Sequence, residues 1–148
     1  MSIVSISFSK IEAEKSKPTQ GKVNVANNVG IKKLEKASLQ MGNTKQDSLK
    51  FSFEFSSKTE PSIGSILIEG DVIFVAEKQV VEDAVKAWDD KKPIDQELLT
   101  PVLNGILKRC NVEALVLSQT MNLPSPIKLP TVSAKEAKET TSQTTSSE

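Results

Sequence analysis

The side chains that carry most protein chemistry are scarce in this sequence of 148 residues. Histidine, the commonest general base and metal ligand, is absent, and Cys110 is the only cysteine. One cysteine supplies neither an intramolecular disulfide nor a cysteine-based zinc site. With no histidine to take its proton, we expect Cys110 to be a buried, inert thiol. We therefore expect no enzyme and no cofactor.

Carboxylates form the next group of candidates. The candidate pairs are Glu69/Asp71, Glu82/Asp83 and Asp89/Asp90. None of the pairs has the repeated spacing of a calcium loop, so solvated surfaces explain them better than a metal site does. Glu69 and Asp71 share one face of a strand by alternation, so they are candidates for a small acidic patch that docks a partner.

The basic side chains give little indication of nucleic acid. Lys32, Lys33 and Lys36 form the only local basic cluster, and no aromatic residue lies nearby to stack on a base. The 19 basic and 19 acidic residues cancel, so no net charge attracts nucleic acid or an anionic membrane. We expect neither partner. No apolar run reaches about 18 residues, and the start MSIVSISFSK does not resemble a secretory signal, which predicts a soluble cytoplasmic protein without membrane insertion.

Alternating apolar and polar residues predict strands. The alternation is clear at Ile3–Ser9 and clearest at Leu49–Phe55, where three phenylalanines share one face. Ile63–Ala76 keeps one phase for longer and is expected to bend or bulge at Gly70. Lys22–Val25 predicts a short strand. The region from Asn27 to Asp47 holds no single period, so part of it is expected to extend that strand and the rest to be loop.

Helical spacing follows the strands. Val80–Trp88 places apolar residues on one side and predicts a short helix. Asp95 is expected to cap a short helical turn, and Thr100 with Pro101 to begin a long helix that ends at Met121. The order of elements predicts an α+β fold, in which a four-stranded antiparallel sheet is followed by a short and a long C-terminal helix.

The far C-terminal part has a different composition. Leu123 to Pro130 holds three prolines, which favour an extended course over the surface. Residues 134–148 contain no large apolar side chain that could offset the entropy of ordering, so they are expected to form a disordered tail. We predict a single domain over residues 1–133 and expect truncation after Ser133 to leave the melting temperature unchanged.

The long helix has apolar residues on more than one side. One stripe predicts an ordinary core face and comprises Leu103, Ile106, Leu107, Cys110, Ala114, Leu117 and Met121. Roughly opposite lie Val112, Leu115 and Val116, with Gly105 on the same side two turns earlier. We expect this back of the helix to meet another subunit or a bound polypeptide, and Gly105 to allow close approach. The alternative is that a loop of the same chain covers it.

The strand predicted at Ile63–Ala76 also has apolar residues in its second phase. Leu67, Ile73 and Val75 lie there, beside Glu69 and Asp71. A strand with apolar residues in both phases needs cover on both faces. We therefore add Leu67, Ile73 and Val75 to the candidate surface for polypeptide binding or self-association.

Three stretches of the sequence resemble the SecB export-chaperone family and its SecB-like relatives. FSFEFSSKTEPSIGSILIEGDVIFVAE looks like the family's third and fourth strands, with Gly70 to Phe74 at the centre of the fourth. The Thr-Pro opening of the long helix, with Arg109 and Cys110 inside it, is similar to the family's Pro-initiated helix. MNLPSPIKLPTVS looks like its closing segment. Together these stretches cover about half of the chain.

The sequence also departs from the family pattern. The long helix is about two turns longer than usual, and Val102 and Leu103 replace the aromatic residues that follow the helical proline. The resemblance implies a homotetramer that binds unfolded polypeptide and passes it to a translocation or folding machine. Acidic residues on the sheet face are the family's motor-docking feature, to which Glu69 and Asp71 correspond by their strand.

We keep two hypotheses about function. The first is a non-enzymatic, chaperone-like protein that binds unfolded polypeptide in the cytoplasm as a homo-oligomer, with protein export as a candidate role. The second is a small structural or adaptor subunit of a larger assembly, such as a ribosome-associated or export complex, in which the back of the helix meets a dedicated partner.

Overall fold

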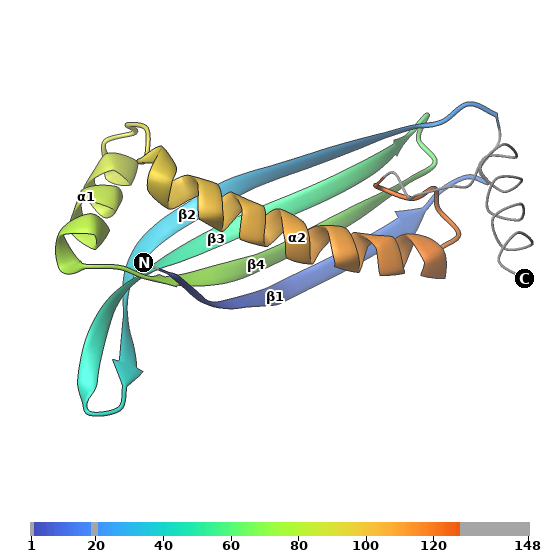
Figure 1. The fold of residues 1–148 in the computed structure, drawn as a ribbon. Coiled ribbons are helices and arrows are strands. Elements are labelled where there is room, and N and C mark those ends of the chain that lie inside the picture. The colour runs from blue at the N-terminus through green and yellow to red at the C-terminus, as the bar shows by residue number, and fades with distance from the viewer. Residues whose placement is uncertain (1, 19–20, 128–148) are drawn as a thin grey trace, which may run out of the picture.

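The computed structural model describes residues 2–18 and 21–127, which form one sheet with two helices on one of its faces (Figure 1). The elements are β1 (Ser2–Lys15), β2 (Asn24–Met41), β3 (Thr44–Glu60), β4 (Gly64–Val75), α1 (Lys78–Asp89) and α2 (Gln96–Thr120). The α+β class and the order of four strands, a short helix and a long helix are therefore confirmed. The tail expected at 134–148 lies outside the described residues, and the domain boundary at 133 stays a prediction.

The sheet is antiparallel throughout, with the strand order β1-β4-β3-β2. β1 and β2 are consequently the two edge strands. α1 packs on β2 and β3, whereas α2 packs on β1, β4 and β3. Both helices lie on the same side of the sheet (Figure 1), which we call the covered face; we call the other side the open face.

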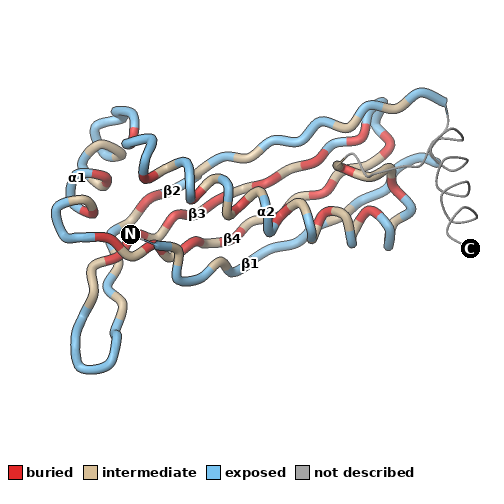
Figure 2. The backbone as a smooth tube through the Cα atoms, viewed as in Figure 1, coloured by how far each residue is buried: buried red, intermediate tan, exposed pale blue. Residues whose placement is uncertain are grey.

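The core lies between the central strands and the helices. β3 turns four apolar side chains toward the helices, none more than 1% exposed: Leu49, Phe51, Phe53 and Phe55. β4 turns Ile66, Ile68, Val72 and Phe74 the same way, and each is buried. Buried residues therefore gather in the two central strands, while the edge strands are mostly exposed (Figure 2). The strands predicted at Leu49–Phe55 and Ile63–Ala76 are confirmed.

Gly70 has a different role from the one that its position in the strand suggested. The pairing of β3 with β4 passes Gly70 without a shift in register, so the expected bulge in β4 is wrong. Gly70 stands opposite Phe53. A Cβ at Gly70 would collide with the carbonyl oxygen of Ser7 and lie 2.8 Å from the Phe53 ring. The glycine therefore makes room for an aromatic side chain in the core.

Both edge strands carry β-bulges, in which one extra residue shifts the side-chain phase. In β2 the register shifts at Lys32, so the inward residues change from Ile31 before the bulge to Leu34 after it. The sequence predicted a short strand at Lys22–Val25 that part of the region from Asn27 to Asp47 extends, with loop over the rest. The strand does extend into this region, as far as Met41. The expected loop was wrong, because an alternation with one inserted residue resembles no alternation at all.

β1 is also longer than predicted, because it continues from Ile3–Ser9 to Lys15. Its register shifts twice, at Val4 and at Ser9. A simple alternation through Ile3–Ser9 would place Val4 on the inward face with Ile6, but Val4 is 47% exposed, so that phase is wrong at Val4. Ile3 instead packs against the core. Bulges in both edge strands interrupt the flat row of free backbone groups that would otherwise pair with other strands.

α2 begins earlier than the sequence suggested. Asp95 is its N-cap, and the Asp95 side chain accepts a hydrogen bond from the backbone N–H of Glu97 at 3.1 Å. Thr100 and Pro101 therefore lie inside the helix and do not start it. Asp95 sets the start of the helix because its carboxylate accepts the free backbone N–H of Glu97 in the first turn, whereas Pro101 lies six residues after the cap.

The chain after α2 crosses one end of the covered face. Leu123 is 9% exposed, and a Cβ at Gly64 would lie 2.7 Å from its side chain. The Asn27 side chain in β2 donates a hydrogen bond to the carbonyl oxygen of Pro126 at 2.6 Å. Residues 122–127 thus close this end of the core, and the remainder of the predicted proline segment lies outside the described residues.

Candidate functional site

The buried side of α2 winds around the helix. Its six buried residues are spaced by four: Leu98, Val102, Ile106, Cys110, Ala114 and Ser118. At about 100° per residue, each step of four moves the buried position by about 40° around the axis. The face that is buried near the start of α2 is therefore exposed near its end. Of the predicted core stripe, Ile106, Cys110 and Ala114 are buried, and Leu103, Leu107, Leu117 and Met121 are only partly so.

This winding separates Gly105 from the residues that the sequence grouped with it. Gly105 faces β1 of the same chain, since a Cβ there would lie 2.7 Å from Cδ1 of Ile3 and 3.5 Å from Cδ1 of Ile6. The expected close approach at Gly105 is made within the chain. Replacing Gly105 by Leu would consequently disturb the fold before it tested any association.

Val112 and Val116 form the exposed back of α2. Val112 is 61% exposed and Val116 is 51% exposed, and they lie one helical turn apart on the same side. Leu115 beside them is partly buried. The sequence left open that a loop of the same chain covers this surface. Within residues 2–18 and 21–127, no loop does so. We call Val112, Leu115 and Val116 the α2 back.

The α2 back lies beside the edge strand β1. Arg109, one turn before Val112, places its guanidinium 5.6 Å from the ring centroid of Phe8 in β1. β1 itself carries two exposed large apolar residues, Val4 and Ile11, which are 47% and 44% exposed. Uncovered apolar side chains therefore occur on both neighbouring elements.

On the open face, the predicted apolar residues do not form a continuous patch. Leu67 lies between Glu12 of β1 and Ser56 of β3. Ile73 lies between Ser5 and Lys50. Each is partly buried, and so is Val75 at the end of β4. Glu69 and Asp71 separate Leu67 from Ile73 and Val75, which are neighbours on this face of β4.

The acidic pair on the open face is engaged within the sheet. Lys32 at the bulge of β2 reaches Glu69 at 2.7 Å and Glu54 at 3.2 Å. The hydrogen bond from Lys32 lowers the pKa of Glu69, and its bonds to Glu69 and Glu54 raise the pKa of Lys32. Asp71 accepts a hydrogen bond from the Ser52 hydroxyl at 2.9 Å. A partner docking at Glu69 and Asp71 would therefore compete with contacts that the fold already makes.

The basic cluster is neutralised in the same way. Lys33 forms an ion pair with Glu35, and the hydrogen bond between them raises the pKa of Lys33 and lowers that of Glu35. Lys36 lies 3.9 Å from Glu82 of α1. Since Lys32 contacts Glu69 and Glu54, every lysine of this cluster lies beside a carboxylate. Little free positive charge is therefore left to bind a phosphate.

Cys110 is fully buried, as predicted. Desolvation raises the pKa of its thiol to about 12, and the Arg109 charge opposes this only in part. The thiol stays protonated at neutral pH and is a poor nucleophile. Within the described residues, no three acidic or cysteine side chains gather closely enough to hold a metal ion.

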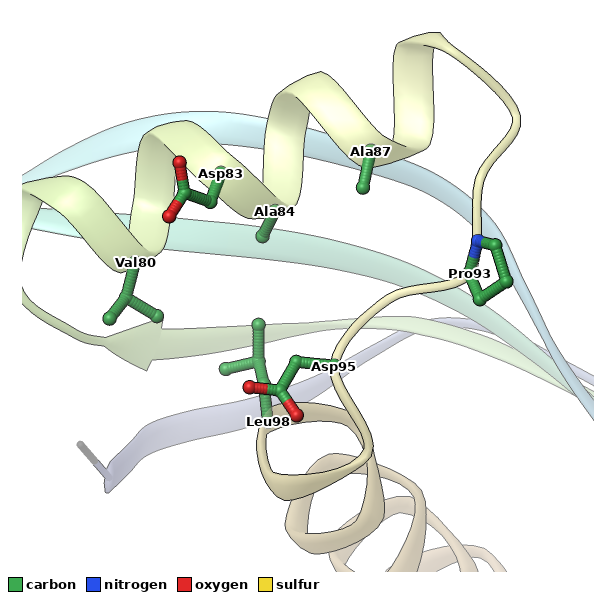
Figure 3. Close-up of a pocket in the computed structure, with 7 residues that line it drawn as sticks. All are labelled: Val80, Asp83, Ala84, Ala87, Pro93, Asp95 and Leu98. Atoms are coloured by element: carbon green, nitrogen blue, oxygen red, sulfur yellow. The ribbon is translucent and has the colours of Figure 1, made fainter.

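A cleft between α1 and the start of α2 was not predicted (Figure 3). It has a volume of about 310 Å³ and is lined by Val80, Asp83, Ala84, Ala87, Pro93, Asp95 and Leu98. Its α1 wall uses positions 80, 83, 84 and 87, the spacing of one helix side. The sequence showed that spacing, but nothing in it indicated that the start of α2 would stand opposite.

Comparison with known proteins gives a likeness in structure but none in sequence. No protein-family model and no curated protein matches the chain. Among solved structures, the chain is similar to the Mycobacterium tuberculosis Rv1957 SecB-like chaperone in complex with a ChAD peptide from the Rv1956 HigA1 antitoxin. The two are 14% identical, with 88% of this chain and 89% of that chain covered and a TM-score of 0.44. At these values the likeness carries no argument about what this chain binds.

Neither helix in the part of the chain that the structure describes is both long and apolar enough to cross a membrane.

Proposed function

We propose that this protein is a non-enzymatic, chaperone-like binder of unfolded polypeptide. The observation that carries the proposal is the exposure of Val112 and Val116 on the α2 back. Removing a valine side chain fully from water is worth about 1.5 to 3 kcal/mol. A polypeptide segment that covered Val112 and Val116 with its own apolar side chains would gain this free energy of burial. In the free protein the two side chains stay in water and the free energy is not gained.

The edge strand β1 supports the same proposal. As an edge strand it is paired only with β4, so the outer backbone groups of Lys10–Lys15, beyond the bulges at Val4 and Ser9, can bond to an extended chain. The exposed side chains of Val4 and Ile11 lie along that strand. Main-chain hydrogen bonds with few apolar contacts would give binding that depends little on sequence, as unfolded clients require.

Several finer points belong to this proposal. Binding would need no nucleotide and would follow mass action on the unfolded state. We propose that the protein acts in the cytoplasm, that it forms a homo-oligomer, and that its clients include chains bound for export. Whether the α2 back contacts clients or a second copy is decided by the experiment below.

The second candidate is a subunit of a larger assembly. The hairpin of β2 and β3 continues beyond the end of β4, where Val75 pairs with Ser48, and projects from the rest of the sheet (Figure 1). Met41 at its tip is 51% exposed. A projecting two-stranded arm with an apolar tip suits a dedicated protein partner.

The test compares two exposed apolar surfaces. In Val112→Ser/Val116→Ser, the α2 back loses its two exposed apolar side chains, while Met41→Ser removes a side chain of similar exposure from the arm. We expect the wild type and Met41→Ser to suppress aggregation of a reduced, unfolded model protein equally, and the double variant to suppress it several-fold less. Circular dichroism should show an unchanged fold for all three.

Other outcomes have distinct meanings. If the wild type suppresses no aggregation, the chaperone proposal is refuted. If only Met41→Ser is impaired, the arm is the binding surface and the assembly-subunit hypothesis gains support. If light scattering shows that the double variant forms a smaller oligomer than the wild type but still suppresses aggregation, the α2 back is an interface between copies.

A further inference from the structure

A hollow at the C-terminal end of α1 is lined by Trp88, Lys91 and Lys92, and it has a volume of about 390 Å³. That volume falls in the range of small-molecule sites, roughly 300 to 1,000 Å³. Trp88 is partly buried and packs against the core, which holds its indole ring in place, and the rest of the side chain lines the hollow. One wall of the hollow is therefore an aromatic group in a fixed position.

Backbone hydrogen bonds at the end of α1 fix the two lysines beside this ring. The N–H of Lys91 donates to the carbonyl oxygen of Trp88 at 3.1 Å, and the N–H of Lys92 donates to that of Ala87 at 2.8 Å. These bonds form a Schellman motif, in which the first residue beyond the cap is left-handed. Lys91 takes that conformation, with a φ of 58°. Glycine suits this position better than lysine does, so the ending of the helix does not by itself explain a lysine there.

The charge of the hollow is positive. Lys91 and Lys92 are exposed, and neither forms an ion pair with a carboxylate in the part of the chain that the structure describes. In this they differ from the basic cluster of β2, where every lysine lies beside a glutamate. The neighbouring Asp89 and Asp90 do not line the hollow. The lining thus combines two positive charges with an aromatic ring, and its complementary ligand is an anion that carries a ring of its own.

We infer that this hollow binds a nucleoside monophosphate, with the base on Trp88 and the phosphate between Lys91 and Lys92. A phosphate monoester carries about two negative charges at neutral pH, so two ammonium groups balance it, whereas a carboxylate carries only one. The indole ring suits the other half of the ligand, because nucleobases stack on aromatic side chains. A concave site also fits a small molecule better than it fits the surface of a membrane. The inference does not rest on the proposed binding of polypeptide, because no residue of the α2 back lines the hollow.

The experiment uses the fluorescence of the full-length protein. Its emission comes from the hollow itself, because Trp88 is the only tryptophan and the chain has no tyrosine. We expect adenosine monophosphate to quench this emission in a saturable way, and calorimetry to give the same affinity. Adenosine, which lacks the phosphate, and ribose phosphate, which lacks the base, should each bind about tenfold weaker, because each keeps only one of the two contacts. The affinity for adenosine monophosphate should fall at high salt, because the two lysines are exposed.

Variants test the two lysines. Lys91→Gln/Lys92→Gln removes both charges but keeps the backbone N–H groups of the Schellman motif, so its fold should survive. The matched control is Lys15→Gln/Lys17→Gln, which removes two charges from a second hollow whose lining has no aromatic residue. We expect adenosine monophosphate to bind about tenfold weaker to the first double variant and as tightly as before to the control. Both double variants should suppress aggregation of an unfolded model protein as the wild type does, since neither changes the α2 back.

Four results would overturn the inference. The first is that adenosine monophosphate neither quenches the wild type nor produces heat on mixing with it. The second is that both double variants lose affinity equally, which would assign the effect to net charge. The third is that ribose phosphate binds as tightly as adenosine monophosphate, which would show that Trp88 contributes nothing. The fourth is that vesicles of phosphatidylglycerol change the emission while adenosine monophosphate does not, which would make the hollow a membrane contact. If Lys91→Gln/Lys92→Gln does not fold, the comparison of the three ligands on the wild type decides the question.

Discussion

Replacing Phe53 tests most directly whether the inward side chains of β3 form the core of this protein. It is 1% exposed and stands opposite Gly70. Its ring meets that of Phe8 edge to face, with 6.4 Å between centroids and an interplanar angle of 77°. The change Phe53→Ala would remove this pair and leave a cavity beside Phe8 of β1 and Gly70 of β4.

The expected cost follows from burial. Phe→Ala in a core costs about 3 to 5 kcal/mol, and loss of the aromatic pair places Phe53 toward the upper end. Glu54→Ala, one position along β3, should cost less than about 1 kcal/mol, because the ion pair with Lys32 is exposed and Lys32 keeps Glu69. Ser52→Ala removes one hydrogen bond, to Asp71, and should cost about 1 kcal/mol.

Chemical denaturation measures the three variants against the wild type. We expect a much lower midpoint for Phe53→Ala and midpoints close to the wild type for the two neighbours, with similar slopes. Phe53→Leu serves as the control for shape, because it keeps most of the volume and should cost clearly less than Phe53→Ala. Equal midpoints for Phe53→Ala and Glu54→Ala would show that the inward and outward faces of β3 are assigned the wrong way round.

Three further predictions concern single positions. Gly70→Ala should lower the denaturation midpoint substantially, because its Cβ would lie 2.8 Å from the Phe53 ring; an unchanged midpoint would contradict that packing. The lowered pKa of Glu69 stabilises the fold above its ordinary titration range, and this contribution is lost as the pH falls through the lowered pKa, so thermal melts should show a weaker acid dependence in Lys32→Ala than in the wild type. Cys110, buried with a pKa of about 12, should react with a thiol reagent only after denaturant is added, and rapid labelling of the native protein would refute its burial.

The central strands were predictable because their pattern is uninterrupted. Leu49 to Phe55 alternates without an inserted residue, and the register between β3 and β4 has no shift. The edge strand β2 was not predictable, because the bulge at Lys32 divides its alternation into two halves of opposite phase. A bulge depends on pairing with another strand, and the local sequence does not record it.

The candidate site was predictable only in part. The sequence identified Val112 and Val116 as apolar residues away from the main stripe, and they are exposed. It wrongly joined Gly105 to them, because it assumed one fixed buried side along α2, whereas the buried positions wind around the helix. The cleft at Asp83 and Asp95 could not be predicted, since its two walls come from different helices.

The sequence by itself determined which reactive side chains are scarce and where the helices and the strands of uninterrupted alternation form. The lack of histidine, the single Cys110 and the periods of two and 3.6 are local properties that composition and spacing reveal. Only the tertiary structure decided which apolar residues stay uncovered, which carboxylates are neutralised by Lys32, and which line the cleft. Those outcomes depend on contacts between residues far apart in the chain, and the packing of the helices on a bulged sheet determines those contacts.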